Sequence, residues 1–430
     1  MTSAKPRTDQ YIGTTEPTAD SYGVIADLIP NSEHPDTVRL ALSLDFESTI
    51  VVYGGMGSGK SYFLGSIMEM LSTRIPQINH LHHAMASISI HFSESENQAP
   101  EWASMIHPNT VEKELAPLRE RYRAEPQGLV NQILICPADM VAKRKEQYPL
   151  HRVEPLLFAP GELPARSWFT LMGAVGEKTA FVQRIALILK KHRNHVTIPI
   201  LRDELASAGL SEGDYQLAVL NLDVAEQFID DTANFLSLIT PGAEIVIDLR
   251  DEYLHQQDCF ALVQVIMHLI AKATDKGKKF KKAILVDEVH NFGDNISLWK
   301  GFEKTMRLMR HELTSLVLAS QDPASVPAII NDLATIITVG KLAASRQLDY
   351  LHACNSAFSD VTIEHLRDLS PGQYYLWALR ATDISLTKKA KLIQGRPRVT
   401  LHGGASVKPS DLATTTTTPD QATPAPATTR

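Results

Sequence analysis

The chain has 430 residues, of which 44% are hydrophobic and 21% are charged, and its formal net charge is −7. These values are typical of an ordinary globular protein, and the acidic balance excludes a surface that is basic all over, as in proteins that coat chromatin or RNA. The three cysteines lie far apart without CxxC spacing, so neither a disulfide framework nor a zinc site is indicated.

The N-terminal residues MTSAKPRTDQ do not have the pattern of a secretory signal. They lack its charged-then-apolar order, and no run of about 18 apolar residues follows anywhere in the chain. We therefore expect a cytoplasmic protein without membrane insertion. Residues 1–20, rich in Thr, Pro and Asp, are expected to be flexible, and short mixed runs within residues 21–48 predict a strand pair.

From Thr49 onward the sequence predicts a strand, a glycine-rich loop and a helix that begins at Lys60. The loop completes the pattern GxxxxGK[ST], whose glycines let backbone N–H groups surround phosphate oxygens while the helix N-terminus adds partial positive charge. Lys60 is expected to bridge the β- and γ-phosphates of ATP. The predicted nucleotide-binding residues are Gly54, Gly55, Gly57, Ser58, Gly59, Lys60 and Ser61.

After a second predicted strand at residues 86–92, helical periodicity dominates between residues 100 and 241. This stretch is too long for a connection inside a compact sheet, so we predict a mostly helical insertion at 100–241. Residues 49–99 and 242–404 then form the ATPase core. The tail at 405–430 is low-complexity Thr, Ala and Pro that is expected to be disordered.

Beyond the insertion, apolar strands alternate with helices, as a parallel sheet covered on both faces requires. The predicted strands span 244–249, 283–288, 315–321 and 335–341, and the predicted helices span 257–273 and 300–311. The expected fold class is therefore α/β, with a RecA-like P-loop NTPase core of the ASCE type, a parallel central sheet and a helical insertion.

Two acidic residues end the strand at 283–286, where hydrolysis of ATP needs a metal ligand and a group that orients water. We predict that Asp287 and Ser61 hold Mg²⁺ and that Glu288 is the general base. The next strand ends at Gln321, whose amide is placed to touch the γ-phosphate or the attacking water. An ordinary strand cap is the alternative interpretation of Gln321.

These motifs resemble the HerA/FtsK-type ring ATPases, including the HerA-like DNA translocases and helicases of bacterial antiviral defence. The resemblance covers most of residues 45–404 and is carried by five stretches, GGMGSGKS, IVIDLRDEY, ILVDEVHNF, SLVLASQDP and RPRVTLHGG. It implies a ring, expected to be hexameric, that uses ATP and Mg²⁺ and binds DNA. The N-terminal 45 or so residues are too few for the complete β-barrel that such translocases usually carry.

The resemblance also implies two further site residues. An arginine near the end of the helix before Gln321 enters the neighbouring subunit's site in this family, and Arg310 stands in the matching place, with Arg307 one turn earlier as the alternative. An acidic residue after the second strand corresponds to either Glu94 or Glu96.

The function expected from these observations is an ATP-hydrolysing ring motor that moves along DNA, with a partner nuclease or a sirtuin-type effector in DNA processing or antiviral defence. A different class of function stays open, in which the ring is an ATP-controlled scaffold that regulates an effector and translocates little. A third interpretation is a conjugation or secretion ATPase that moves DNA or protein through a membrane pore.

Overall fold

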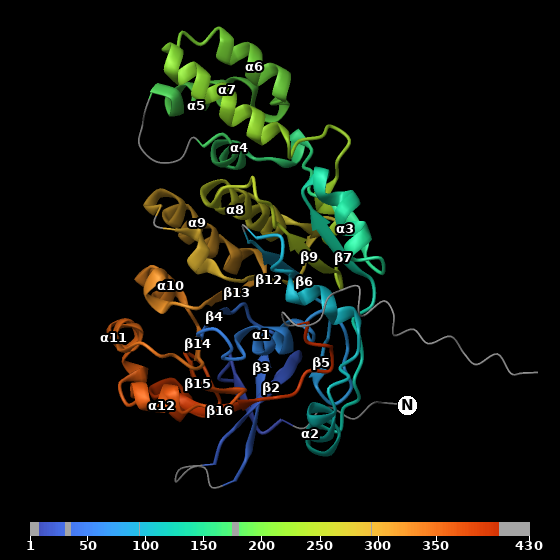
Figure 1. The fold of residues 1–430 in the computed structure, drawn as a ribbon, viewed down its shortest axis with the longest axis vertical. Helices are drawn as coiled ribbons and strands as arrows, with labels where there is room; N and C mark the ends of the chain where they lie inside the picture. Colours follow the sequence, from blue (N-terminus) through green and yellow to red (C-terminus); the bar gives the residue numbers. More distant parts are fainter. Residues whose placement is uncertain (1–7, 31–35, 94, 174–179, 294, 404–430) are drawn as a thin grey trace, which may run out of the picture.

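The computed structural model describes residues 8–30, 36–93, 95–173, 180–293 and 295–403, which form one large mixed sheet with helices on both faces (Figure 1). The expected low-complexity tail lies outside the described residues, as do residues 1–7. Within the described part of the chain, every helix is too short or too polar to span a lipid bilayer.

The centre of the sheet is parallel, as predicted, and its strands are buried except at Ser315 of β13, because helices cover both faces. β13 lies between the strand that leads into the glycine-rich loop and the strand that leads into the acidic pair. In spatial order these strands are β14 (Ile336–Val339), β4 (Thr49–Tyr53), β13 (Thr314–Ser320), β12 (Lys282–Val286), β6 (Ala86–His91) and β9 (Glu244–Asp248).

The two faces of the sheet carry separate hydrophobic cores, which follow from the alternation of side chains along each strand. In β4, Ile50 and Val52 pack in the same core as α1 (Lys60–Met68), whereas Val51 and Tyr53 pack in the opposite core. The opposite core includes α8 (Gln256–Lys272), α9 (Ile296–Met309), α10 (Ala328–Leu333) and α11 (Ser345–Cys354).

The region 100–241 differs from the predicted helical insertion, because two of its segments are strands of the main sheet. β7 (Gln132–Cys136) pairs in parallel with β9, and β8 (Arg152–Pro155) pairs with β7. Both runs have only four or five residues, and a short apolar run does not distinguish a strand from a helix. α2 (Glu112–Tyr122) and α3 (Val141–Gln147) lie in the same region and flank β7 along the chain.

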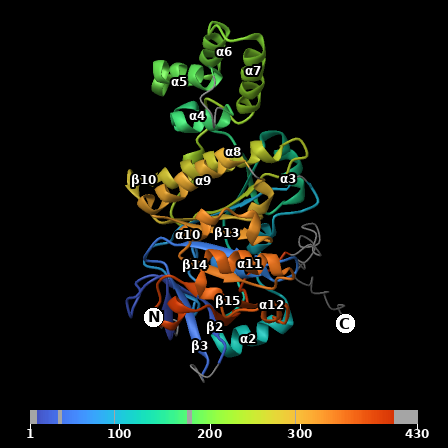
Figure 2. The ribbon, with the colours of Figure 1, turned by 90° about the vertical axis from the view of Figure 1, so that its left-hand side faces the viewer.

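The helical part outside the sheet therefore covers a shorter stretch of the sequence than the predicted insertion at 100–241. It contains α4 (Ala165–Leu171), α5 (Ala180–His192), α6 (Ile198–Ala206) and α7 (Glu212–Glu226), which gather at one end of the molecule in both views (Figures 1 and 2). Trp168, Leu201 and Leu222 are buried within it, and α4 packs against α8.

Strands from both ends of the chain extend the other side of the sheet beyond β14, and their pairings are antiparallel except that of β1 with β3, which is parallel (Figure 2). The strand pair predicted at 21–48 is present as two antiparallel strands, and a third strand, β1, lies inside the stretch that we expected to be flexible. In spatial order the strands are β15 (Gln373–Ala378), β16 (Lys391–Gly395), β2 (Tyr22–Leu28), β3 (Val38–Ser43) and β1 (Gln10–Ile12).

The remaining short elements lie around this frame. They are β5 (Asn79–His80), which pairs with β2, the hairpin of β10 (Thr274–Asp275) and β11 (Lys278–Lys279), and the short helices α12 (Ile363–Arg367) and α13 (Ser385–Lys388).

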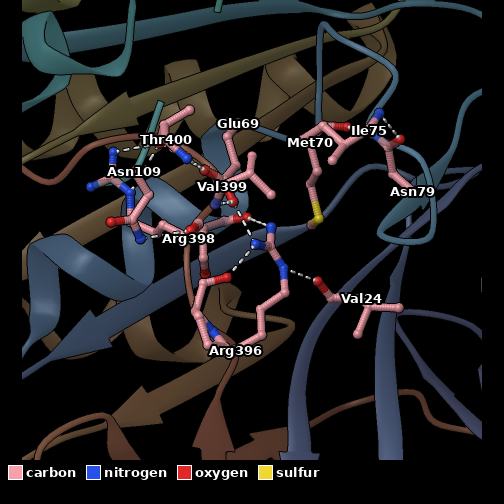
Figure 3. Close-up of polar contacts among 12 residues, drawn as sticks. Val24, Glu69, Met70, Ile75, Asn79, Asn109, Arg396, Arg398, Val399 and Thr400 are labelled. Atoms are coloured by element: carbon pink, nitrogen blue, oxygen red, sulfur yellow. Dashed lines mark hydrogen bonds and ion pairs between the residues drawn. The ribbon is translucent and has the colours of Figure 1, made fainter. Parts of the chain in front are cut away.

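A buried ion pair ties the end of α1 to the segment after β16, which we call the C-terminal strap (residues 396–402) (Figure 3). Glu69 and Arg396 are both fully buried. Glu69 also accepts hydrogen bonds from the N–H groups of Val399 and Thr400, at 3.2 and 3.1 Å, and from the Thr400 hydroxyl at 2.7 Å. Arg396 donates to the carbonyl oxygens of Val24 and Ser66 at 2.5 and 2.6 Å. The strap therefore holds the C-terminal end of α1, the end opposite to the glycine-rich loop.

Candidate functional site

The glycine-rich loop leaves the carboxyl end of β4 and enters α1 through two glycines in the left-handed region, Gly57 with φ of 71° and Gly59 with φ of 81°. A Cβ atom on Gly59 would also lie 2.8 Å from the Tyr374 hydroxyl, and one on Gly54 would lie 2.4 Å from Ser58 Oγ. Both positions therefore need glycine. The N–H groups of the first turn of α1 have no acceptor within the helix, as at any helix N-terminus.

The loop contains one buried polar atom that lacks a partner among the described residues, Ser58 Oγ. The N–H groups of Gly54 and Gly55 are bonded to the neighbouring strand ends, at Ser320 and Lys341. The loop is thus held in place by the adjacent strands of the sheet. A buried hydroxyl and a helix N-terminus at one place form a surface that suits an anion such as phosphate.

Lys60 joins the loop to the acidic pair, although the two motifs are 227 residues apart in the sequence. Its Nζ atom donates to Asp287 Oδ1 at 3.1 Å and to Glu288 Oε1 at 3.0 Å, and Lys60 is only 5% exposed. Burial alone would lower the pKa of Lys60, but the two carboxylates outweigh it and raise the pKa above its usual value. The ammonium is therefore charged at neutral pH.

Glu288 occupies a backbone conformation that is uncommon for a residue with a side chain, with φ of 52°. Its N–H donates to Asp287 Oδ1 at 2.9 Å, and Gln321 Nε2 donates to its Oε1 at 3.0 Å. His290 Nδ1 lies 3.1 Å from the other oxygen, Oε2. Unfavourable backbone conformations held by surrounding contacts concentrate at functional sites. The structure thus brings Lys60, Asp287, Glu288 and Gln321 together.

Glu101 is a site residue that the sequence analysis missed. It begins a short 3-10 helix (Glu101–Ile106), and its carboxyl group hydrogen-bonds Ser61 and lies against the His402 ring of the C-terminal strap. Burial raises the pKa of Glu101 to about 7, and nearby Asp287 adds to the rise. Burial likewise lowers the pKa of His402 to about 4, so the imidazole is neutral. No local pattern marks Glu101, because its partners lie far away in the sequence.

Two oxygen-bearing side chains beside the loop, Ser61 and Asp287, suit a magnesium ion. Within the described residues no three acidic, histidine or cysteine side chains form a metal-binding group. Mg²⁺ typically takes one or two protein oxygens and completes its shell with waters and phosphates, so a full protein cage is not required. Ser61 offers a hydroxyl and Asp287 a carboxylate beside the loop, and this donor set fits the ion.

The remaining predicted residues lie away from this cluster. Arg310 and Arg307 are exposed at the end of α9, and Arg307 pairs with Glu303 at 2.9 Å. α9 ends beside the start of β13, whereas the loop lies at the opposite, carboxyl edge of the sheet. The intervening strand of seven residues spans about 20 Å. Neither arginine therefore reaches the site of its own chain.

The two acidic candidates after the second strand have different outcomes. Glu94 lies outside the described residues. Glu96 accepts from Lys143 at 2.8 Å and from the fully buried Arg144 at 3.1 Å. It thereby belongs to an ion cluster that includes Asp248 at the end of β9.

No protein-family model matches the sequence, and no curated protein matches it. Among solved structures, the bacterial conjugative coupling protein TrwB is similar with a TM-score of 0.50 and 10% identity, over 82% of this chain and 86% of that one. The plasmid coupling protein TrwB in complex with the non-hydrolysable GTP analogue GDPNP gives the same TM-score of 0.50, identity of 10% and coverage of 82% and 86%. VirB4 of Thermoanaerobacter pseudethanolicus has a TM-score of 0.49 and 11% identity, over 89% of this chain and 98% of that one.

The fold is that of the conjugative coupling protein TrwB. The expected RecA-like core with its parallel sheet is thus confirmed. At 10% identity the similarity to TrwB concerns the fold alone.

Proposed function

We propose that this chain binds and hydrolyses ATP. The observation that carries the proposal is the position of Lys60 Nζ, 3.1 Å from Asp287 and 3.0 Å from Glu288. It places the phosphate-binding loop and a pair of carboxylates at one point, which is what P-loop hydrolysis requires. The TrwB structure with GDPNP shows a nucleotide analogue on a protein of this fold.

In the proposed reaction each residue has a separate role. The loop of Gly54, Gly55, Gly57, Ser58 and Gly59 surrounds the phosphates, with Gly54 and Gly55 anchoring it through their N–H groups, and Lys60 bridges the β- and γ-phosphates. Bound Mg²⁺ supplies charge neutralisation at the phosphate oxygens, with Ser61 and Asp287 as its protein ligands.

Glu288 is the general base for the attacking water, and Gln321, hydrogen-bonded to Glu288, senses the γ-phosphate. Arg310 acts from a neighbouring copy, since it lies at the far edge of its own sheet. Arg307, which already pairs with Glu303, is the less suitable of the two arginines for this role.

We further propose that the assembly is a homo-oligomeric ring, hexameric in form, that moves along DNA. The support is the fold shared with a conjugative coupling protein, together with the need for a second copy to supply Arg310. A nuclease or sirtuin-type effector as partner, and a role in antiviral defence or DNA processing, are expectations that follow from the resemblance of the motifs alone.

The first test is Glu288→Gln, measured as ATP binding and phosphate release on the full chain. We expect ATP binding to be retained and turnover to fall about 10²- to 10⁴-fold, because a positioned base contributes that much. Glu120→Gln on the exposed face of α2 is the matched control. Undiminished turnover in Glu288→Gln would refute the assigned base.

The second test separates a motor from a scaffold. A motor should show turnover that duplex DNA stimulates, with an affinity for DNA that falls steeply as salt rises. A rate of ATP turnover that is the same with and without DNA, but changes when a co-purified protein is added, would instead favour the scaffold. Native mass spectrometry with ATP and DNA gives the subunit number.

A further inference from the structure

A cavity of about 420 Å³ opens beside the first turn of α1. Gly59 and Tyr62 form part of its wall, and the rest comes from α2, from β15 and β16, and from the C-terminal strap. Its volume lies within the range of about 300–1,000 Å³ typical of small-molecule sites. None of Lys60, Asp287 and Glu288 lines this cavity, so it is separate from the point where the γ-phosphate is cleaved.

The cavity begins where a bound nucleotide must leave the loop. Lys60 and the two carboxylates define the γ-phosphate end of the chain of phosphates, as argued above. The nucleoside is attached to the opposite end, and it has to occupy space next to the loop and the first turn of α1. Gly59 and Tyr62 belong to both the loop region and the cavity wall, which makes the two spaces continuous.

The walls are carbon-rich, and α2 adds Lys113 and Glu114 of opposite charge, which leaves room for a planar base between apolar surfaces. The hydroxyl of Tyr62 donates to Glu114 at 2.7 Å and that of Tyr374 donates to the Gly59 carbonyl at 2.7 Å, so both polar tips already have partners. The guanidinium of Arg396 is turned away to Glu69 and to carbonyl oxygens (Figure 3). Aromatic faces stack with every nucleobase.

Two polar side chains in the wall, the Lys113 ammonium and the Gln394 amide, have no such partner among the described residues. The Gln394 amide, from β16, lines the cavity and makes no side-chain hydrogen bond with any described residue. A carboxamide presents a donor and an acceptor side by side, which is the arrangement that pairs with N6 and N7 of adenine. Of the two, only Gln394 offers both a donor and an acceptor, so it is the group in the wall that can pair with the edge of a base.

We propose that this cavity holds the adenine and ribose of the nucleotide whose phosphates the loop binds, with the Gln394 amide pairing with the base. The proposal rests on the proposed ATP binding. Gln394 acts here as a specificity residue and takes no part in the cleavage of the phosphate bond.

The experiment compares ADP with pyrophosphate by titration calorimetry on the full chain in magnesium buffer, because the two ligands differ by the nucleoside. Wild type is expected to bind ADP at least about tenfold more tightly than pyrophosphate. Gln394→Trp fills the cavity and should weaken the binding of ADP by about tenfold or more, while the affinity for pyrophosphate stays unchanged. Gln394→Ala removes the pairing alone and should weaken ADP about three- to tenfold. Gln216→Trp, exposed on α7, is the matched control and should change neither.

Each other outcome counts against the proposal. Unaltered ADP binding in Gln394→Trp would place the base elsewhere, and equal losses for ADP and pyrophosphate would mean that the substitution damages the loop. Equal affinity of wild type for ADP and GDP would overturn the pairing with adenine. If wild type bound neither ADP nor pyrophosphate, the proposed ATP binding itself would be wrong, and this result differs from all the others.

Discussion

The buried pair of Glu69 and Arg396 allows a prediction in which the two partners are not equivalent. Replacing Arg396 by Met removes the cation, but Glu69 keeps three hydrogen-bond donors, from Val399 and Thr400. Breaking a buried pair in this way costs about 3–5 kcal/mol in the free energy of unfolding. We place Arg396→Met at the lower end of that range, because the remaining donors still stabilise the carboxylate.

Replacing Glu69 by Met should cost more. It leaves the Arg396 guanidinium buried against carbonyl oxygens, and it also removes the acceptor of three donors, each of which costs about 1–3 kcal/mol when buried without a partner. The total loss therefore exceeds about 5 kcal/mol. The double variant should lose about 3 kcal/mol less than the sum of the single losses, since removing both charges leaves neither one uncompensated.

The measurement is urea unfolding followed by tryptophan fluorescence, with urea chosen because it carries no charge. A surface pair, Arg119 on α2 and Glu125 just beyond its end, supplies the control, and each of its single variants should change stability by less than about 1 kcal/mol. Equal losses for Glu69→Met and Arg396→Met, or strictly additive losses in the double variant, would refute the account of the pair.

Four further predictions concern the site. Gly59→Ala should weaken ADP binding and lower the free energy of unfolding by at least about 1–2 kcal/mol, because residue 59 has a positive φ. Adding Tyr374→Phe removes the hydroxyl that the new Cβ would meet and should relieve part of both losses, as calorimetry and urea unfolding would show. Strictly additive effects of the two substitutions would contradict this contact. Gln321→Ala should retain ATP binding but slow phosphate release about tenfold or more, whereas an unchanged rate would reduce Gln321 to a strand cap. Arg310→Ala should slow release about 10³-fold, and mixing it with Lys60→Ala subunits should restore turnover if the arginine acts from a neighbouring copy; no recovery would exclude that role. Because the pKa of Glu101 is raised to about 7 from an ordinary 4.5, the folded state holds its proton more tightly than the unfolded state, so stability falls as pH rises from about 4.5 to 7. The free energy of unfolding of wild type should fall by about 3 kcal/mol relative to that of Glu101→Gln, which has no carboxyl group to titrate at this position. If the wild type and Glu101→Gln gave parallel pH profiles in urea unfolding, the raised pKa of Glu101 would be wrong.

The parts of the site that were predictable are those in which neighbouring residues in the chain remain neighbours in space. The loop from Gly54 to Ser61 and the pair Asp287–Glu288 each follow a buried strand, and parallel strands bring their carboxyl ends to one edge. Their meeting at Lys60 could therefore be expected from two local patterns and one rule of topology.

The parts that were missed depend on contacts without a local pattern. Glu101 meets His402 across most of the chain, and no periodicity or spacing records such a pair. The sequence predicts β7 and β8 as parts of a helical insertion, because a run of four or five residues fits a helix or a strand equally well. They are strands because β9 offers an edge with which β7 pairs, and β8 then pairs with β7. The cavity beside Gln394 likewise forms only when β16 and α1 are side by side.

The position of β16 has a consequence for how the chain is made. β16 sits between β15 and β2, so the N-terminal strands join the sheet only through a strand near the other end of the sequence. At ~5–20 residues per second, β2 leaves the ribosome on the order of half a minute to a minute before its partner exists. During that interval the part of the β2 edge that takes β16, at Ala26, Asp27 and Leu28, is open, although all seven residues of β2 are buried in the native protein. Nascent chains that stall before β16 are thus the species most exposed to aggregation and most dependent on chaperones.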